Sequence, residues 1–565
     1  MLFACATTKV NQLQPPMQGI QLDLIARHTS GQFGEGAAEV VAYHVNSKTL
    51  YLVNGAAQSI DIIDINELPT QSLVMPYSGS NLNSTRLKLP DRVMTQQGEL
   101  RLKSPNSLDI HGDLLAIAMQ NSNKQANGAV LFYHISDSKP TLIKAVETGS
   151  LPDMVKFSHD GNMLVVANEG EPSKDYQVDP EGTISIIKTD GVIANSDIRL
   201  NFRSFNSQMD VLKTSGVKFA SPQGTSVAQD LEPEYIAISD DNTTAYVTLQ
   251  ENNAIAIVDL VNPRITAVKG LGYKDWGQYK IDVSNKDGAQ LNRYDNLFGL
   301  YQPDTIYSYS VEGETYLLTA NEGDAREYIY QTDEQTCKAA GHQYDDEDGC
   351  ISYSEEVRAK DLSFKSPSII DSYYDKNGIG RLKVTKVLGD EDGDGYHEKL
   401  YSYGARSFSI WDTQANQVFD SGDQFATVLL SKYGEKFNAN ENKNDGDNRS
   451  DDKGSEPEAL TVGKVGHRYY AFIGLERMGG IMIYDVTNPK KPQYINYINN
   501  RNVDVEFNID EDTDPVSLQG DYNQVGDLSP EGLVFIAAQN SPTGKPLLVV
   551  ANEVSGSLTI YHIRQ

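Results

Sequence analysis

The sequence predicts an all-β protein, and more specifically a β-propeller built from four-stranded antiparallel blades. Three observations lead to this fold class. One unit of strands and turns recurs along the chain, its strands alternate apolar and polar residues with period two, and no segment has the pattern of a convincing amphipathic helix. Repeated meanders whose edges must be hidden favour a closed propeller over an open sheet.

Each repeat opens with a small residue or Pro, followed by a carboxylate or amide and an alternating strand. A turn leads to a second, apolar strand that ends in Asn, Gln or Glu, and a third apolar strand follows. In chain order the copies cover residues 36–65, 104–135, 151–188, 231–260, 302–328, 455–486 and 528–563.

The spacing of the repeats favours eight blades. The opening acids or amides stand at positions 39, 106, 153, 234, 304, 458 and 531, and five of the six spacings run from 47 to 81 residues, whereas the spacing from 304 to 458 is 154. Residues 399–412 (KLYSYGARSFSIWD) fall in that gap and have the pattern of the second and third strands of another copy. Seven blades with one long excursion are the alternative.

The last copy has only three strands, and residues 20–27 (IQLDLIAR) are suited to supply the fourth and close the ring. We therefore expect residues 20–565 to form one propeller domain with long insertions at about 327–375 and 430–455. The second insertion contains an Asn- and Asp-rich stretch, 438–454, whose composition is typical of either a mobile loop tip or an ordered metal loop.

The first residues resemble the end of a bacterial lipoprotein signal, in which the cysteine becomes the lipidated first residue. Cys5 stands in such a Leu-Phe-Ala-Cys sequence, but the charged and apolar regions that should precede it are missing. Either the true start lies upstream or the match is fortuitous. On the first interpretation, residues 1–19 are a signal remnant and tether, and the protein is a periplasmic or outer-surface lipoprotein; a secreted protein is the other extracytoplasmic form.

Cys337 and Cys350 enclose a short acidic loop that has no CxxC pair, so a zinc knuckle is not expected there. A disulfide between them fits an oxidising compartment and would stabilise the fold by about 3 kcal/mol in the chain-entropy model. Two unpaired thiols are the alternative.

The charge of the chain excludes several classes of partner. It has 78 acidic and 48 basic residues and a formal net charge of −30. Such a charge excludes binding to a nucleic-acid backbone, and it is compatible with collecting cations or with solubility alone. No run of about 18 apolar residues is present, so no helix is expected to span a membrane. The chain is expected to be a monomer whose contact with a membrane is a lipid on Cys5.

The acids that open the repeats predict a ring. In a propeller the first strand of each blade lines the central channel, so its first residues gather at one mouth. The expected ring is Glu39, Asn106, Asp153, Glu234, Asp304, Glu458 and Glu531, to which the second-strand ends add Gln120, Glu169, Gln250, Glu322, Glu476 and Glu553. So many carboxylates need compensation in a low-dielectric funnel, and oxygen-bound hard cations, calcium first, are the simplest form of it. Acids that cap turns by accepting backbone N–H bonds are the alternative.

A second acidic pattern lies in the segment LGDEDGDGYHEKL. Asp390, Asp392 and Asp394, followed by Gly395, reproduce the first six positions of a calcium loop. Glu398 stands too early for a complete EF-hand, and strands replace the flanking helices. The pattern therefore predicts a free-standing calcium turn, with a solvated acidic turn as the alternative.

Arg326, Arg406 and Arg477 follow repeat motifs near the predicted mouth. Guanidinium groups suit phosphate or carboxylate oxygens, and ion pairs with the neighbouring acids are the alternative role. The chain has no G-x-S-x-G, GxGxxG, Walker-type or HExxH motif, so serine-hydrolase, ATPase, dinucleotide-binding and zinc-protease functions are not expected.

Several of these segments resemble the choice-of-anchor I proteins, which are bacterial surface propellers similar to the mesenchyme-specific cell-surface glycoproteins. The resemblance rests on PDMVKFSHDGNMLVVANEGEP, TANEGDAREY, YGARSFSIWD, EPEALTV and SPEGLVF, and it covers roughly residues 20–565. It implies a metal site that also includes Asp324, and an activity like that of propeller-type, calcium-dependent phosphatases. The chain departs from the family at DKGSEPEAL, where Ser455 and Ala459 replace the usual Pro and Gly.

Two functions follow as hypotheses. The first is an extracytoplasmic, metal-dependent phosphoesterase in which the mouth acids hold calcium, with iron, manganese or zinc as a second metal, and the three arginines stabilise charge on a phosphorylated small molecule. The second is a non-catalytic calcium-binding surface propeller for adhesion or mineral contact. A propeller that binds nothing is the third interpretation.

Overall fold

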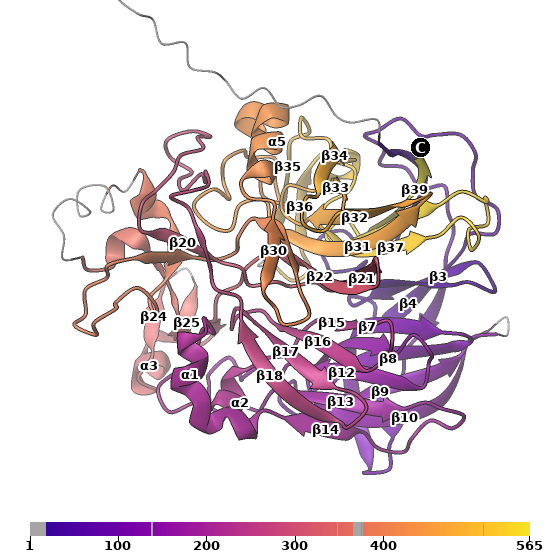
Figure 1. Ribbon diagram of the computed structural model, residues 1–565, viewed down its shortest axis with the longest axis horizontal. Helices are drawn as coiled ribbons and strands as arrows, with labels where there is room; N and C mark the ends of the chain where they lie inside the picture. The colour runs from indigo at the N-terminus through magenta and orange to yellow at the C-terminus, as the bar shows by residue number, and fades with distance from the viewer. Residues whose placement is uncertain (1–18, 137–138, 347, 365–374, 376, 512) are drawn as a thin grey trace, which may run out of the picture.

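The chain folds into a β-propeller in the computed structural model, which describes residues 19–565 except 137–138, 347, 365–374, 376 and 512 (Figure 1). Seven sheets are antiparallel meanders with one strand innermost. These innermost strands are β2 (Val41–His44), β7 (Glu99–His111), β11 (Pro152–Phe157), β15 (Ile236–Ile238), β21 (Ile306–Val311), β31 (Pro457–Val465) and β37 (Pro530–Ile536). Each contacts the next in this order, and β37 contacts β2, so the contacts close a ring. The predicted tether and Cys5 lie outside the described residues.

We name each blade by its innermost strand. The outer strands of the β2 blade are β3 (Thr49–Asn54), β4 (Ser59–Asp64) and β5 (Thr85–Lys88), and those of the β7 blade are β8 (Leu114–Asn121), β9 (Asn127–His134) and β10 (Thr141–Ser150). The short strand β6 (Arg92–Met94) pairs only with the first residues of β7. The β11 blade continues with β12 (Met163–Asn168), β13 (Thr183–Lys188) and β14 (Ile198–Asn201), and the β15 blade with β16 (Thr244–Leu249), β17 (Ala254–Asp259) and β18 (Arg264–Gly270). The β21 blade continues with β22 (Glu314–Asn321), β29 (Ser407–Trp411) and β30 (Gln417–Asp420), the β31 blade with β32 (Arg468–Leu475), β33 (Ile481–Asp485) and β34 (Gln493–Ile498), and the β37 blade with β38 (Leu547–Asn552) and β39 (Ser557–Arg564).

The N-terminal strand completes the last blade, as the sequence predicts. β1 (Gln21–Thr29) pairs antiparallel with β39, from Gln21 opposite Arg564 to Thr29 opposite Ser557. Leu24, Ile25 and Ala26 of β1 are buried. The two ends of the described chain therefore hold each other in one sheet, and the ring has no open edge at this blade.

The prediction of eight blades is not confirmed. Residues 399–412 form no blade of their own in the described part of the chain. β29 is instead the third strand of the β21 blade, where it pairs with β22, and β28 (Leu400–Ser402) pairs in parallel with β20 (Leu297–Leu300) in a separate sheet. A long insertion separates the second and third strands of this blade, and it lengthens the repeat spacing without adding a blade.

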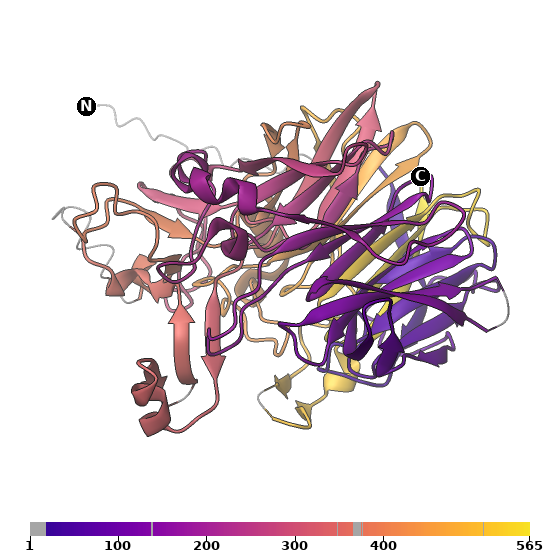
Figure 2. The same cartoon turned by 90° about the horizontal axis from the view of Figure 1, so that it is seen from below.

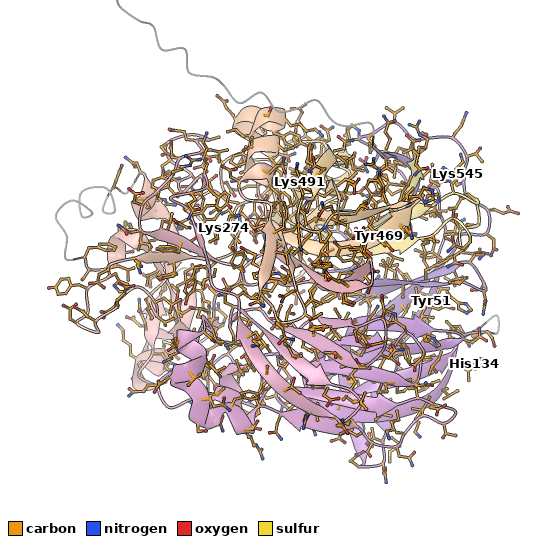
Figure 3. The ribbon with its side chains drawn as sticks, viewed as in Figure 1. Tyr51, His134, Lys274, Tyr469, Lys491 and Lys545 are labelled. Carbon is orange, nitrogen blue, oxygen red and sulfur yellow. A yellow bond between two sulfur atoms is a disulfide. The ribbon has the colours of Figure 1, made fainter. Side chains whose placement is uncertain are left out.

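The separate sheet consists of β19 (Tyr273–Asp275), β20, β28, β27 (Lys383–Thr385) and β26 (Glu356–Arg358). Lys274, labelled in Figure 3, anchors this sheet to the β21 blade. Its fully buried ammonium donates to the carbonyls of Ala405 and Gly422 at 2.8 and 2.7 Å and lies 3.0 Å from Asp420 Oδ1.

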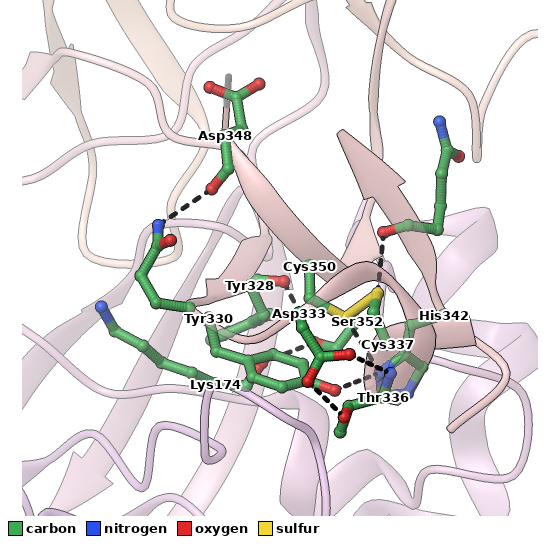
Figure 4. The surroundings of a disulfide bond; sticks show 12 residues. Lys174, Tyr328, Tyr330, Asp333, Thr336, Cys337, His342, Asp348, Cys350 and Ser352 are labelled. Atoms are coloured by element: carbon green, nitrogen blue, oxygen red, sulfur yellow. Dashed lines mark hydrogen bonds between the residues drawn. A yellow bond between two sulfur atoms is a disulfide. The ribbon is translucent and has the colours of Figure 1, made fainter. Parts of the chain in front are cut away.

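Two smaller sheets project from one side of the molecule (Figure 2). One contains β23 (Glu327–Tyr330), β25 (Gly349–Ser354) and β24 (Gln343–Asp345) with helix α3 (Glu334–Ala339), and the other is the hairpin of β35 (Phe507–Asp510) and β36 (Ser517–Gly520). The predicted disulfide between Cys337 and Cys350 is confirmed: it joins α3 to β25, and both cysteines are buried (Figure 4).

The prediction that no amphipathic helix is present is wrong for one segment. Helix α5 (Gln424–Tyr433) buries Phe425, Val428 and Leu429, which are spaced for one helical face. Ten residues with a Val and a Thr have a pattern that fits a strand equally well, so the sequence does not separate the two. The other helices in the described part of the chain, besides α3, are α1 (Met209–Thr214), α2 (Val227–Asp230) and the 3-10 turns η1 (Arg203–Gln208), η2 (Ala359–Asp361), η3 (Ile379–Arg381), η4 (Gly434–Lys436) and η5 (Tyr522–Gln524).

The apolar core lies between neighbouring blades. Leu50 and Leu52 of β3, for example, share one cluster with Val549 and Ala551 of β38. Both faces of each blade are covered by its neighbours, which is why a second strand such as β3 is buried at every position and does not alternate. Within the described ranges, no helix combines the length and the apolar character needed to cross a membrane.

Candidate metal centre at the channel mouth

The acids that open the repeats lie where the innermost strands begin, and the strand register places the ends of the second strands at the same level. In the β11 blade, Pro152 pairs with Asn168, so Asp153 and Glu169 come to the same end of the sheet. The structure thus brings the two predicted sets of acids together at one mouth. The pKa of Glu531, for example, is raised by burial and by repulsion from acids of three other blades.

A buried asparagine fixes the end of the second strand in several blades. Its side-chain amide donates to a hydroxyl of the third strand, and the Glu of the repeat follows one residue later. These bonds join Asn168 to Ser185, Asn321 to Ser409 and Asn552 to Thr559, at 3.0, 2.8 and 3.3 Å. The recurrent Asn-Glu pair therefore has two roles, since Asn ties the sheet together and Glu faces the mouth.

The backbone entering four innermost strands is strained. The residue before the proline adopts a left-handed conformation in Leu151, Gln302, Glu456 and Ser529, with φ of 47, 42, 50 and 55°. Such conformations cost about 1–3 kcal/mol each and cluster at functional sites. The sharp entry places the acid that follows the proline at the channel mouth.

The opening acids do not cap turns. Among the described residues, no backbone N–H donates to the carboxylates of Glu39, Asp153, Glu234, Glu458 or Glu531. Several buried side-chain oxygens at the mouth have no hydrogen-bond partner at all, namely those of Gln120 (Oε1), Glu234, Glu251, Glu458, Glu476 and Glu531 (Oε2). Buried polar atoms in native proteins are nearly always bonded, so this group of bare oxygens fits a bound cation.

Two glycines form a cradle around Glu39 and Glu553. A Cβ on Gly36 would lie 3.3 Å from Oε1 of Glu39 and 3.2 Å from Oε1 of Glu553, and a Cβ on Gly55 would lie 2.6 Å from Oε1 of Glu39. Any side chain at Gly55 would therefore displace the Glu39 carboxylate. Backbone without side chains lets two carboxylates from adjacent blades approach the same point.

Below the acids the channel is lined by apolar and polar residues, the latter including Asp109, Lys156 and His159. A cavity of about 430 Å³ is lined by residues that follow the opening acids on the innermost strands, among them Val41, Val155, Ile236, Ile306 and Val534. Burial of the carboxylates at the mouth raises the free-energy cost of their charge. Burial raises the pKa of Asp153 to about 6, and burial with repulsion raises the pKa of Glu234 well above its usual value.

One side of the mouth carries its own cations. Lys453 lies 2.8 Å from Oε1 of Glu322 and 3.1 Å from Oε2 of Glu456. Arg477 lies 2.9 Å from Oε2 of Glu456 and 3.0 Å from Oε1 of Glu476. We call Glu322, Asp324, Glu441, Glu456 and Glu476 the compensated acids, since each pairs with Lys453, Arg449 or Arg477.

The rest of the mouth has no such partners. Among the residues that the structure describes, no Lys, Arg or His comes within 4 Å of nine carboxylates, which we call the bare acids: Glu39, Asp153, Glu169, Glu234, Glu251, Asp304, Glu458, Glu531 and Glu553. Coulomb interactions couple them, because repulsion from Glu553 and Asp153 raises the pKa of Glu39, after the larger effect of burial. The bare acids are the part of the mouth that needs charge from outside the chain.

Sequence reasoning missed five charged residues of this site: Glu232, Glu251, Glu441, Lys453 and Glu456. A signal for two of them was present, because Glu232 and Glu456 are the first residues of Glu-Pro-Glu in two copies of the repeat. In both copies this first Glu is buried and binds arginine, and the second Glu is a bare acid at the mouth. Glu251 directly follows Gln250, the predicted end of a second strand, whereas Glu441 and Lys453 belong to no repeat motif.

The three predicted arginines are already engaged. Arg326 is 2% exposed, lies 2.5 Å from Oε1 of Glu232 and donates to the carbonyl of Asp230. Arg406 donates to the carbonyls of Asp282, Ser450 and Asp452, and burial lowers its pKa to about 10. Arg477 binds the compensated acids. The ion-pair role, the alternative at the sequence level, is thus found for Arg326 and Arg477.

The predicted calcium turn forms a second, separate acidic cluster. Asp390 accepts backbone N–H bonds from Gly393, Asp394 and Gly395 at 2.8, 3.1 and 2.8 Å. Oxygens of Asp390, Asp392 and Glu398 lie within 4.8 Å of one another. Glu398 thus joins the cluster although the sequence places it too early for an EF-hand, whereas Asp394 accepts from the N–H of Tyr396.

The raised pKa values predict an unusual pH dependence. A carboxyl whose pKa is raised by folding binds protons more tightly in the folded state, so the free energy of unfolding falls as pH rises from about 4 through the folded pKa, about 6 for Asp153. The pKa of Glu456 is lowered by its arginines and Lys453, so this residue changes the free energy of unfolding with pH only below about pH 4. We expect the melting temperature in EDTA to fall from pH 5 to pH 8, and we expect calcium to reverse this fall at pH 8. A melting temperature in EDTA that rises over this range would contradict repulsion between the carboxylates of the mouth.

Comparisons with known proteins identify related chains. The model of the choice-of-anchor I domain matches residues 39–489. Gigasin-3a of Magallana gigas is 32% identical over 192 residues, which are 33% of this chain and 65% of that protein. The mesenchyme-specific cell surface glycoprotein of Strongylocentrotus purpuratus is 26% identical over 341 residues, 55% of this chain and 43% of that protein. The chain thus spans less than two thirds of either relative.

Solved structures resemble the chain at low identity. A chain of the Kuenenia stuttgartiensis hydrazine synthase is 12% identical with a TM-score of 0.42, covering 95% of this chain and 99% of that one. The WD40 domain of Toxoplasma gondii coronin is 8% identical with a TM-score of 0.42, covering 96% and 87%.

Proposed function

The chain belongs to the choice-of-anchor I family, and from this premise and the geometry of the mouth we propose that it is an extracytoplasmic propeller that binds divalent cations, calcium first, on the bare acids. The observation that carries the proposal is the set of buried carboxylate oxygens without any hydrogen-bond partner, including those of Glu234, Glu251 and Glu531. Glu234 and Glu251 are each 8% exposed, so water compensates them poorly.

The chemistry of the donors selects the class of ion. Every bare acid offers carboxylate oxygens, and neither the bare nor the compensated acids are joined by a cysteine or histidine among the mouth residues described above. Calcium takes six to eight oxygens in flexible geometry, whereas zinc and copper favour nitrogen and sulfur ligands. Nine carboxylates exceed what one calcium needs, so the proposal is for more than one ion. When bound, these ions would supply the positive charge that the bare acids lack.

An extracytoplasmic location is part of the proposal. The disulfide between Cys337 and Cys350 is typical of proteins in oxidising compartments. One relative is by its name a cell surface glycoprotein. A lipid anchor on Cys5 stays a prediction from the sequence.

Phosphoester hydrolysis, the activity that the family resemblance implies, makes a further demand on the site. Charge on a transferring phosphoryl group must be met by groups free to face it. The three arginines predicted for this role are bonded to carboxylates or carbonyls, so bound ions would have to provide that charge themselves. An assay of a chromogenic phosphomonoester with calcium, manganese or iron, and then with EDTA, tests this; metal-dependent turnover would extend the proposal from binding to catalysis.

Calcium titration tests the binding itself. Metal-free protein titrated by calorimetry should take up more than one calcium per chain, and at a hundredfold excess over Kd each site adds about 2.7 kcal/mol to the free energy of unfolding. A variant with Asp390→Asn and Asp392→Asn is the control, because it removes the turn and leaves the mouth intact. Folded protein that takes up no calcium at millimolar concentration, or that loses all uptake in this control, would refute the proposal.

A further inference from the structure

Three compensated acids have the spacing of a metal site. Carboxylate oxygens of Glu322, Glu456 and Glu476 all lie within 4.8 Å of one another, and all three residues are buried. They come from separate segments, since Glu322 follows β22, Glu476 follows β32 and Glu456 precedes β31. Oε2 of Glu476 has no partner although this residue is only 8% exposed.

Lys453 occupies this group of acids. Its ammonium lies 2.8 Å from Glu322, 3.1 Å from Glu456 and 3.7 Å from Asp324, and the residue is 9% exposed. An ammonium carries one charge and three donors at a single point, whereas calcium carries two charges and accepts six to eight oxygens. The ammonium thus lies between two carboxylates of the group, Glu322 and Glu456, and beside Asp324, and it neutralises only part of the charge of the group.

The loop that carries Lys453 is fixed in place by Arg406. The guanidinium donates to the carbonyls of Ser450 and Asp452, directly before Lys453, and to that of Asp282 on the other side. Gly454 packs closely on it, because a Cβ there would lie 2.9 Å from Cδ of Arg406. Arg406 is therefore a positioning residue for the Lys453 loop.

We propose that Lys453 is a built-in cation that fills a latent divalent-cation site formed by Glu322, Glu456 and Glu476, with Asp324 at its edge. The inference deepens the proposed function, and it rests on that function only for the ions on the bare acids. It divides the mouth in two: the bare acids take cations from solution, and this group takes its cation from an insertion of the chain itself. The C-terminal end of the Asn- and Asp-rich stretch, 438–454, thus supplies the cation of this group.

Removing the ammonium should open the latent site. In Lys453→Met, Glu322 loses its ion pair while Arg449 and Arg477 remain on Glu456, so the group keeps uncompensated negative charge. We expect a lower melting temperature in EDTA, one additional calcium per chain by equilibrium dialysis with elemental analysis, and a larger calcium-induced rise in melting temperature than in the parent. Lys443→Met is the matched control, because Lys443 lies in the same insertion and pairs with the exposed Asp445. This control should bind as many ions as the parent.

Calcium uptake and folding of the Lys453→Met variants test the inference. Equal calcium uptake by Lys453→Met and the parent overturns it. If Lys453→Met unfolds in EDTA, refolding in calcium supports the inference, and failure of calcium to restore folding overturns it. The double variant Lys453→Met/Glu322→Gln should fold better than Lys453→Met in EDTA and gain no calcium. A parent that binds no calcium beside a Lys453→Met variant that binds one would refute the proposed function and support the latent site.

Discussion

Replacing Asp153 by Asn and Glu531 by Gln in one chain is expected to stabilise the metal-free protein at pH 8 and to remove most of its response to calcium. Both residues are bare acids of different blades, and burial, followed by repulsion from neighbouring acids, disfavours their ionised forms. An amide keeps the shape and removes the charge, so the free energy of unfolding in EDTA should rise by roughly 1–2 kcal/mol. The calcium-induced gain, about 2.7 kcal/mol per site in the parent at a hundredfold excess over Kd, should shrink toward zero.

Denaturant unfolding in EDTA and in calcium measures both effects. A control with Glu99→Gln and Asp240→Asn makes the same change of charge at exposed positions away from the mouth, where side chains are 48% and 60% exposed. It should behave like the parent. Equal calcium gains in the mouth variant and the parent would place the metal elsewhere, the turn at Asp390 being the next candidate.

Arg326→Met should cause the largest loss of stability among the single changes considered. The variant leaves Glu232, which is 1% exposed, without its ion pair, and Asp230 loses the same neighbour. Breaking a buried ion pair by removing one partner costs about 3–5 kcal/mol. Thermal and denaturant unfolding should show this loss in calcium as well as in EDTA, since Arg326 serves the fold and not the bound ion.

Two companion variants separate this role from a catalytic one. Arg326→Met with Glu232→Gln removes both charges and should regain part of the lost stability. Arg203→Met breaks a pair with Glu181 in which the arginine side chain is 68% exposed, and such surface pairs contribute about 0–1 kcal/mol. An Arg326→Met variant as stable as Arg203→Met would show that the guanidinium is not needed for folding, and the predicted role toward phosphate would then regain support.

The sequence by itself determined the parts of this protein that repeat. Period-two strands predicted the meanders, and a propeller requires the first residues of its innermost strands to meet, so the sequence alone places Glu39, Asp153 and Glu531 at one mouth. The fourth strand of the last blade and the disulfide were predicted for similar reasons, because each satisfies a local need: an open sheet edge at β39, and two cysteines 13 positions apart.

Only the tertiary structure decided what depends on segments far apart in the chain. The number of blades could not be read from spacing, since an insertion of unknown path lies between β22 and β29. The division of the mouth into compensated and bare acids could not be predicted either, because Lys453 meets Glu322 across 131 positions and no repeat motif contains Lys453. A repeated pattern specifies the contacts that every blade makes in common, whereas the charge balance at the mouth depends on unique side chains that insertions bring there.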